Sequence, residues 1–208
     1  MWTGWNWVGI ILWIIVVAYF VYVIHFIRVK QLMLIVRTKK AFAWKNTWQY
    51  TGLLAVALIA LVSMFYLTFF RQVDLSNKNE VEISTKYHPL VLTPIKDDFY
   101  YVQAHRGTSG DKPVVSYSYW LKHNKYTISG HNGTVVDGPV PMNVVASVYP
   151  WDLAKLKAQD TKNGKAFVAV MTIRYKQTIL NGIGMRSGHV ANRYTMIRVP
   201  AEGFVYHK

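Results

Sequence analysis

Two uncharged apolar runs of 20 residues each dominate the first third of this chain. They cover residues 8–27 (VGIILWIIVVAYFVYVIHFI) and 51–70 (TGLLAVALIALVSMFYLTFF), and neither contains Asp, Glu, Lys or Arg. At about 1.5 Å per residue, each run would form a helix about 30 Å long, which is the thickness of the hydrocarbon core of a bilayer. The sequence therefore predicts two transmembrane helices.

The first run lacks the features of a cleaved signal peptide. The residues before it, MWTGWNW, carry no basic side chain, and the run ends in HFIRVK without a small-residue cleavage site. We therefore expect the first helix to remain in the protein.

The segment between the runs, residues 28–50, is basic and has no acidic residue. Short loops rich in Lys and Arg stay in the cytoplasm, so we expect this loop to be cytoplasmic and to contact lipid headgroups. The short tail, residues 1–7, and everything after residue 70 would then be extracytoplasmic in a multi-pass plasma-membrane protein. The bases that carry this prediction are Arg28, Lys30, Arg37, Lys39, Lys40 and Lys45.

After a polar stalk, residues 71–79, the chain reads as a β-rich domain over residues 80–208. Alternation with a period of two favours strands in EVEISTKY, FYYVQAH, PVVSYSYWLK and RYTMIRV. We also expect a strand in VPMNVVASVY, and a hairpin in KYTISGHNGTVVDG with Asn132-Gly133 as its turn. YPWDLAKLKAQD, between Asp152 and Asn163-Gly164, predicts one short helix. The expected fold is thus a transmembrane α-helical hairpin followed by a mainly β extracytoplasmic domain with one short helix.

The chain lacks the sequence patterns of common catalytic and metal sites. It has no cysteine, which excludes disulfides and thiolate chemistry. Its histidines form no H-x-x-x-H or H-E-x-x-H pair, and G-x-S-x-G and P-loop patterns are missing. We identify no catalytic, cofactor-binding or metal-ligating residue and expect no cofactor. The pattern argues against an enzyme but leaves open an active site assembled from residues far apart in the sequence.

The most distinctive local stretch is NGIGMRSGHVANRY, residues 181–194. Glycine-rich loops with exposed N–H groups and arginines can bind phosphate or carboxylate. The alternative is a glycine-rich connection between two strands. The candidate anion- or partner-binding residues are Arg174, Lys176, Arg186, Ser187, His189 and Arg193, with Arg198 adding charge on the following strand.

The charge balance of the exported part favours an anionic partner. Residues 71–208 contain 18 Lys and Arg against 10 Asp and Glu, a net charge of +8. Such a domain would be attracted to a phosphate-rich wall polymer or to lipid headgroups. Nucleic acid is not expected, because the domain is predicted to lie outside and has no recognition helix or RNA-binding aromatic signature.

Several motifs together resemble an uncharacterised family of two-span membrane proteins from lactic-acid bacteria. They are WVGIILWIIVVAYFVYVI, YPW, and NGIGMRSGH with YTMIRVP. The resemblance covers most of the chain and implies a Gram-positive cell envelope, but it supplies no catalytic residues. We expect a membrane-anchored extracytoplasmic interaction module that binds a protein partner or an anionic envelope polymer. The alternative is an accessory subunit of a larger membrane complex, such as a transporter or envelope-synthesis machinery, and an envelope enzyme comes third.

Overall fold

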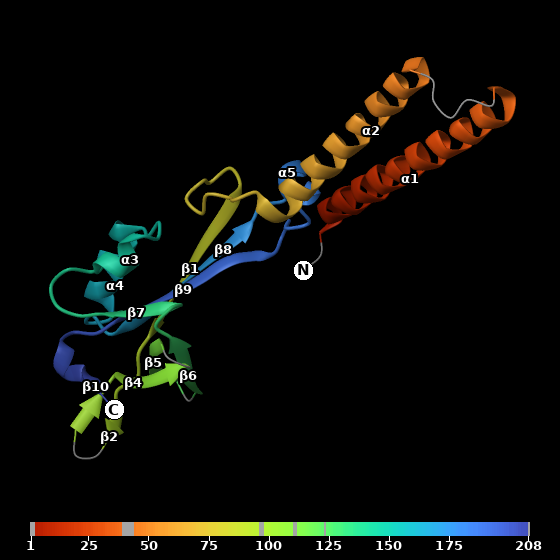
Figure 1. Ribbon diagram of the computed structural model, residues 1–208. Helices are drawn as coiled ribbons and strands as arrows, with labels where there is room; N and C mark the ends of the chain where they lie inside the picture. Colours follow the sequence, from red (N-terminus) through yellow and green to blue (C-terminus); the bar gives the residue numbers. More distant parts are fainter. Residues whose placement is uncertain (1–2, 39–43, 96–97, 110–111, 123, 208) are drawn as a thin grey trace. The chain divides into compact units, whose positions relative to one another are not determined.

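The computed structural model describes residues 3–38, 44–95, 98–109, 112–122 and 124–207 (Figure 1). The chain divides into two compact units. One, here called the helical unit, contains Met1–Asp74 and Tyr175–His189; the other, the β unit, contains Leu75–Arg174 and Val190–Lys208. A stretch that lies between two strands in the sequence therefore belongs with the helices.

The helical unit is built from α1 (Gly4–Thr38), α2 (Trp44–Phe65), the π-helical turn η1 (Tyr66–Phe70) and the short α5 (Ile179–Ile183). α1 packs against both α2 and α5. Val23 and Ala57, each only 1% exposed, are buried in this unit, and the small Ala57 side chain is of the type that lets apolar helices approach closely.

Both long helices are apolar enough to cross a membrane. Within the described residues, Gly4–Val36 and Thr47–Phe70 have mean hydropathies of 2.7 and 2.5. At about 1.5 Å per residue, both exceed the thickness of a bilayer core of about 30 Å. The two predicted apolar helices near the N-terminus are confirmed.

The helices extend into the basic segment, residues 28–50. α1 continues past Ile27 to Thr38, and α2 begins at Trp44, because this stretch holds many good helix formers and no proline or glycine. Arg28 and Lys30 are exposed on α1, with Lys30 Nζ 5.6 Å from the centroid of the Phe26 ring. Of the remaining bases, Arg37 is in α1, Lys45 is in α2, and Lys39 and Lys40 lie outside the described residues.

The described part of the β unit contains two four-stranded sheets and a two-stranded ribbon. The orders are β1-β8-β9-β7, β10-β4-β5-β6 and β2-β3, with β7–β9 and β4–β10 parallel. A core cluster that includes Val102, Tyr119, Val168 and Ile197 joins the two larger sheets. The mainly β domain is therefore confirmed. The strands are β1 (Val81–Pro89), β2 (Thr93–Ile95), β3 (Asp98–Tyr100), β4 (Val102–Ser109), β5 (Lys112–Leu121), β6 (Asn124–Ser129), β7 (Gly133–Val136), β8 (Phe167–Tyr175), β9 (Val190–Arg198) and β10 (Val205–His207).

The short helix expected after YPW is present as α4 (Leu153–Lys162). The Asp152 carboxylate caps it by accepting a hydrogen bond from the Lys155 amide at 3.2 Å. Asn163 follows its last turn, and Gly164 has a φ of +56°, a left-handed conformation that glycine adopts without strain. Residues 71–80 join η1 to β1 without a helix or strand, and η2 (Glu202–Phe204) precedes β10.

The strand expected in VPMNVVASVY is wrong. Residues Val144–Ser147 form the helical turn α3 instead. Asn143 decides this locally, because its Oδ1 accepts from the Ala146 amide at 2.9 Å while its Nδ2 donates to the Val135 carbonyl at 3.2 Å. The side chain thus caps the turn and ties it to β7.

The hairpin expected at Asn132-Gly133 is also wrong. β6 pairs with β5, whereas β7 pairs in parallel with β9 in the other sheet. The Thr195 amide donates to the Asn132 carbonyl at 2.9 Å, and a Cβ at Gly133 would lie 2.7 Å from the Thr195 carbonyl oxygen. The glycine therefore permits a close approach to β9 rather than a two-residue turn.

Candidate functional site: a docked glycine loop and an inter-sheet cleft

The glycine-rich stretch folds as a closed loop within the helical unit. We call residues 176–189 the glycine loop. At its neck, the Gly188 amide donates to the Tyr175 carbonyl at 2.9 Å and the Tyr175 amide to the His189 carbonyl at 3.0 Å. Inside it, Thr178 Oγ1 caps α5 by accepting from the Asn181 amide at 3.3 Å. The loop therefore has a defined backbone.

Two glycines bring the loop and α1 into backbone contact. A Cβ at Gly9 would lie 2.5 Å from the Gly182 carbonyl oxygen and 2.7 Å from that of Ile183. A Cβ at Gly182 would overlap with the Trp5 carbonyl oxygen. Only glycine allows so close an approach at both positions.

A buried amide holds the same face of α1 to the loop. Asn6 is 0% exposed, and its Nδ2 donates to the Ser187 carbonyl at 3.0 Å while its Oδ1 accepts from the Ser187 amide at 3.0 Å. Thr3 Oγ1 donates to Ser187 Oγ at 2.8 Å. Asn6 and Gly9 are three residues apart and so share one helix face. This face recognises the loop through its backbone.

Arg186 binds the end of the second helix. Its Nη1 donates to the Arg71 carbonyl at 2.6 Å and its Nη2 to the Thr68 carbonyl at 2.8 Å. Helix C-termini carry unsatisfied carbonyls and partial negative charge, which a guanidinium satisfies. The indole of Trp13 on α1 donates to Thr68 Oγ1 at 3.1 Å. One loop thus joins the ends of both long helices.

The six candidate binding residues are divided between the two units. Lys176, Arg186, Ser187 and His189 belong to the helical unit, where Arg186 and Ser187 contact the helices. Arg174 and Arg193 belong to the β unit, on β8 and β9. Sequence reasoning identified the loop as special, but its glycines and its serine serve docking contacts that local spacing does not reveal.

Arg198 is a core residue rather than part of a basic surface, so its expected surface role is wrong. It is 0% exposed and pairs with Asp160, with Nε 3.0 Å from Oδ1. Its Nη2 also donates to the Gly138 carbonyl at 2.6 Å and its Nη1 to that of Val136 at 3.4 Å. The guanidinium therefore links β9 to α4 and to the end of β7, as buried charges require.

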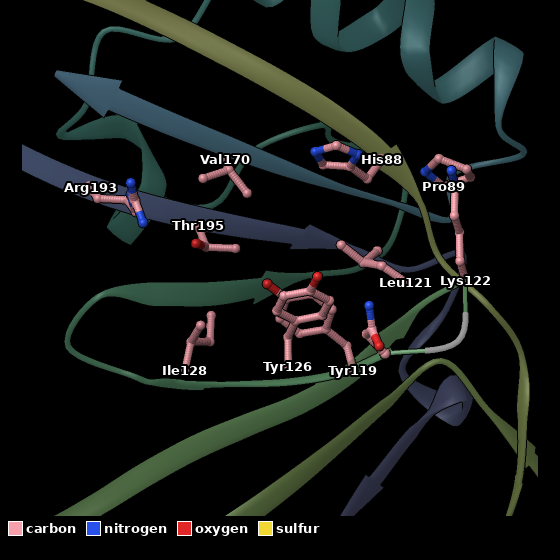
Figure 2. Close-up of a pocket in the computed structure, with 11 residues that line it drawn as sticks. His88, Pro89, Tyr119, Leu121, Lys122, Tyr126, Ile128, Val170, Arg193 and Thr195 are labelled. Atoms are coloured by element: carbon pink, nitrogen blue, oxygen red, sulfur yellow. The ribbon is translucent and has the colours of Figure 1, made fainter.

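A cleft lies between the two sheets of the β unit (Figure 2). Its volume is about 490 Å³, within the usual range for small-molecule sites. One wall comes from β5, β6 and their turn, and the other from β1, β8 and β9. The described lining residues are His88, Pro89, Tyr119, Leu121, Lys122, Asn124, Tyr126, Ile128, Val170, Arg193 and Thr195.

Two tyrosines form an aromatic wall of the cleft. Tyr119 and Tyr126 are cross-strand neighbours, and their rings stack at 5.9 Å with 18° between the planes. Tyr119 is 3% exposed and Tyr126 44%. Figure 2 shows both rings pointing across the cleft toward the strand that carries Thr195. Burial, and then the nearby Tyr126, raise the pKa of Tyr119 above its usual value, so its phenol stays neutral.

Apart from its tyrosines, the ionisable side chains of the cleft are all basic. His88, Lys122 and Arg193 line it, and none of the described lining residues is Asp or Glu. None of these three side chains has a hydrogen bond or ion pair with any residue in the described ranges. The apolar side chains of Leu121, Ile128 and Val170 also line the cleft. The arrangement suits a ligand with one anionic group and an apolar part.

Sequence reasoning named only Arg193 of this cleft. Alternation in PVVSYSYWLK correctly placed Tyr119 and Leu121 on one face of a strand. Their meeting with His88 and Arg193 depends on the packing of two sheets, which no local pattern specifies. Over the described ranges, no group of three or more His, Asp or Glu side chains is placed to hold a metal ion.

Two apolar helices of membrane-spanning length suggest association with a membrane, and a β-rich unit with a basic cleft follows them. A family model named after a Lactobacillus locus tag matches residues 4–206, and the chain belongs to this uncharacterised family. The resemblance drawn from the sequence motifs is confirmed. No curated protein and no solved structure matches the chain.

Proposed function

We propose that the protein is a membrane-anchored binding module of the cell envelope, whose β unit binds an anionic envelope component outside the plasma membrane. The observation that carries this proposal is the inter-sheet cleft, whose described lining has three basic side chains and no carboxylate. The net charge of +8 on residues 71–208 adds long-range attraction for the same class of partner.

The proposed orientation rests on charge. Six Lys and Arg lie within residues 28–50, and the N-terminal tail has none. By the positive-inside rule this segment is cytoplasmic, and both termini are extracytoplasmic. The family's Lactobacillus name supports a Gram-positive envelope as the setting.

Retention of the first helix is supported by its contacts with the glycine loop. Asn6 and Gly9 hold that loop through two hydrogen bonds and a close backbone approach. Removal of α1 as a signal sequence would expose Ser187 and leave its backbone groups without these partners. We therefore propose a two-span protein rather than a secreted one.

The first experiment tests orientation. Because the chain has no cysteine, single Thr38→Cys and Lys157→Cys variants report unambiguously on labelling of intact cells by a membrane-impermeant maleimide. We expect labelling at position 157 and not at position 38. The reverse pattern would place the β unit in the cytoplasm and overturn the proposal.

The second experiment tests the anionic partner. Full-length protein in lipid nanodiscs is titrated with polyphosphate and with neutral dextran of matched length. We expect polyphosphate alone to bind, to weaken as salt rises because of screening, and to weaken in Arg193→Gln but not in Arg174→Gln. Equal effects of the two variants would remove the cleft from the proposal. Co-purification of a stoichiometric protein companion, with no polyphosphate binding, would favour the accessory-subunit alternative instead.

A further inference from the structure

We infer that the inter-sheet cleft binds a small amphipathic anion, in which one phosphate or carboxylate is joined to an apolar chain. This inference rests on the proposed function and narrows its anionic component to one chemical class. It is carried by the convergence of basic and apolar side chains from both sheets on one cavity of about 490 Å³.

The basic groups come from three separate segments. His88 is on β1, Lys122 is in the turn between β5 and β6, and Arg193 is on β9. Figure 2 shows all three around the same cavity, with His88 and Arg193 on the β1-β8-β9-β7 sheet and Lys122 beside strands of the other sheet. The fold therefore brings basic groups from distant parts of the sequence to one cavity. An anionic ligand group suits Arg193, because a guanidinium can bind a phosphate or carboxylate through two parallel hydrogen bonds.

Arg198, on the same strand, is an example of an arginine whose guanidinium has a purely structural role. Arg198 is neutralised by Asp160 and donates to two backbone carbonyls. Arg193 has no such partner within the described ranges, and it is exposed. Its hydrogen-bonding groups are therefore available to a ligand.

The apolar part of the ligand is inferred from the other side chains that line the cleft. Leu121, Ile128 and Val170 offer only hydrocarbon surface, and the stacked rings of Tyr119 and Tyr126 continue it. A free inorganic anion would leave this surface unused. Each buried CH₂ adds about a fourfold gain in affinity, so a chain of several carbons should dominate binding strength while the bases select the charge.

The test uses the full-length chain in zwitterionic nanodiscs. A single Asn124→Cys substitution, at an exposed position of the cleft lining, carries an environment-sensitive fluorophore. Three probes are titrated: hexyl phosphate, inorganic phosphate and hexanol. We expect saturable binding of hexyl phosphate at free concentrations at least tenfold lower than for either of the other two.

Two variants test the recognition of the anionic group and of the apolar chain separately. Arg193→Gln should weaken hexyl phosphate binding about tenfold, the effect of one charge-assisted contact, whereas the matched Arg174→Gln should not change it. Val170→Thr keeps the side-chain shape but replaces a methyl group with a hydroxyl, so it should weaken the binding of hexyl phosphate and leave the binding of inorganic phosphate unchanged. An unaltered thermal transition in each variant shows that folding is intact.

The outcomes decide the inference. Equal affinities for inorganic phosphate and hexyl phosphate would mean that the cleft is an anion site only. Equal affinities for hexanol and hexyl phosphate would mean that it is an apolar cavity only. Either result, or the absence of saturable binding, overturns the inference. If polyphosphate binding still depends on Arg193 in those cases, the proposed function stands and only the ligand class falls. Nanodiscs made with phosphatidylglycerol identify the source, because a bilayer ligand would occupy the cleft before any probe is added and a soluble one would not.

Discussion

Replacing Gly9 with alanine should loosen the glycine loop from α1. The added Cβ would lie 2.5 Å and 2.7 Å from two backbone carbonyl oxygens of the loop. Non-bonded heavy atoms rest about 3.5–4.0 Å apart, so the loop backbone must retreat by roughly 1 Å. Neither carbonyl belongs to a side chain that can rotate away.

The expected magnitude follows from overpacking. Extra methyl groups in well-packed sites cost about 1–3 kcal/mol. The helix propensity gained by replacing glycine with alanine, about 1 kcal/mol, does not enter, because α1 is helical whether or not the loop is docked. At 1.4 kcal/mol per factor of ten, the docked population should fall by about 5-fold to 150-fold relative to the undocked one.

Amide hydrogen exchange at Ser187 measures this equilibrium directly. Its N–H is buried and donates to Asn6 Oδ1 at 3.0 Å, so exchange requires the loop to leave the helix. Gly4→Ala is the matched control, because it lies on the same helix and a Cβ there meets nothing within 4 Å. We expect protection at Ser187 to fall in Gly9→Ala by the factor above and to stay unchanged in Gly4→Ala. Equal protection in both variants would refute the docking of the loop on this face.

Three further predictions concern buried polar groups. Burial, then the nearby Tyr149, raises the pKa of Tyr194 to about 12 from an ordinary 10.0, so the neutral phenol stabilises the fold below pH 10 and this stability should be lost as the pH rises toward 12. Tyr194→Phe should remove that alkaline loss in thermal unfolding curves and cost little at neutral pH, because the buried hydroxyl has no partner within the described ranges. Asp160→Ala should lower the free energy of unfolding by about 3–5 kcal/mol in denaturant titrations, since it leaves the buried guanidinium of Arg198 without its counter-charge; a loss under 1 kcal/mol would contradict this. Arg186→Gln should cost about 1.5–3 kcal/mol through its lost bonds to two helix-end carbonyls, and an unchanged exchange rate at Ser187 would count against the shared loop contact.

Local features of the sequence predicted those elements whose cause is local. The apolar runs produced the two long helices, and Asp152 with Asn163-Gly164 produced α4 as expected. The ends of the helices were less predictable, since basic residues mark a membrane boundary but are good helix formers and do not end a helix.

The wrong predictions concern segments whose local structure depends on residues far away in the sequence. Asn132-Gly133 has the composition of a hairpin turn, but the Thr195 amide on β9 donates to the Asn132 carbonyl, and β7 pairs with β9 in the other sheet. Asn143 caps a turn because Val135 holds its amide. The contacts of the glycine loop could not be predicted for the same reason, since the partners of Gly182 and Ser187 are residues near the N-terminus.

The docked glycine loop also makes the proposed membrane anchor specific to this protein. A generic anchor is interchangeable, because any sufficiently apolar hairpin holds a domain at a membrane. Here the first turns of α1 present Asn6 and Gly9 as a shaped receptor for a segment encoded far downstream. A chimera with a foreign anchor would reach the membrane, but its glycine loop would lack the contacts with Asn6 and Gly9. The residues around Asn6 and those around Ser187 are therefore expected to vary together in sequence.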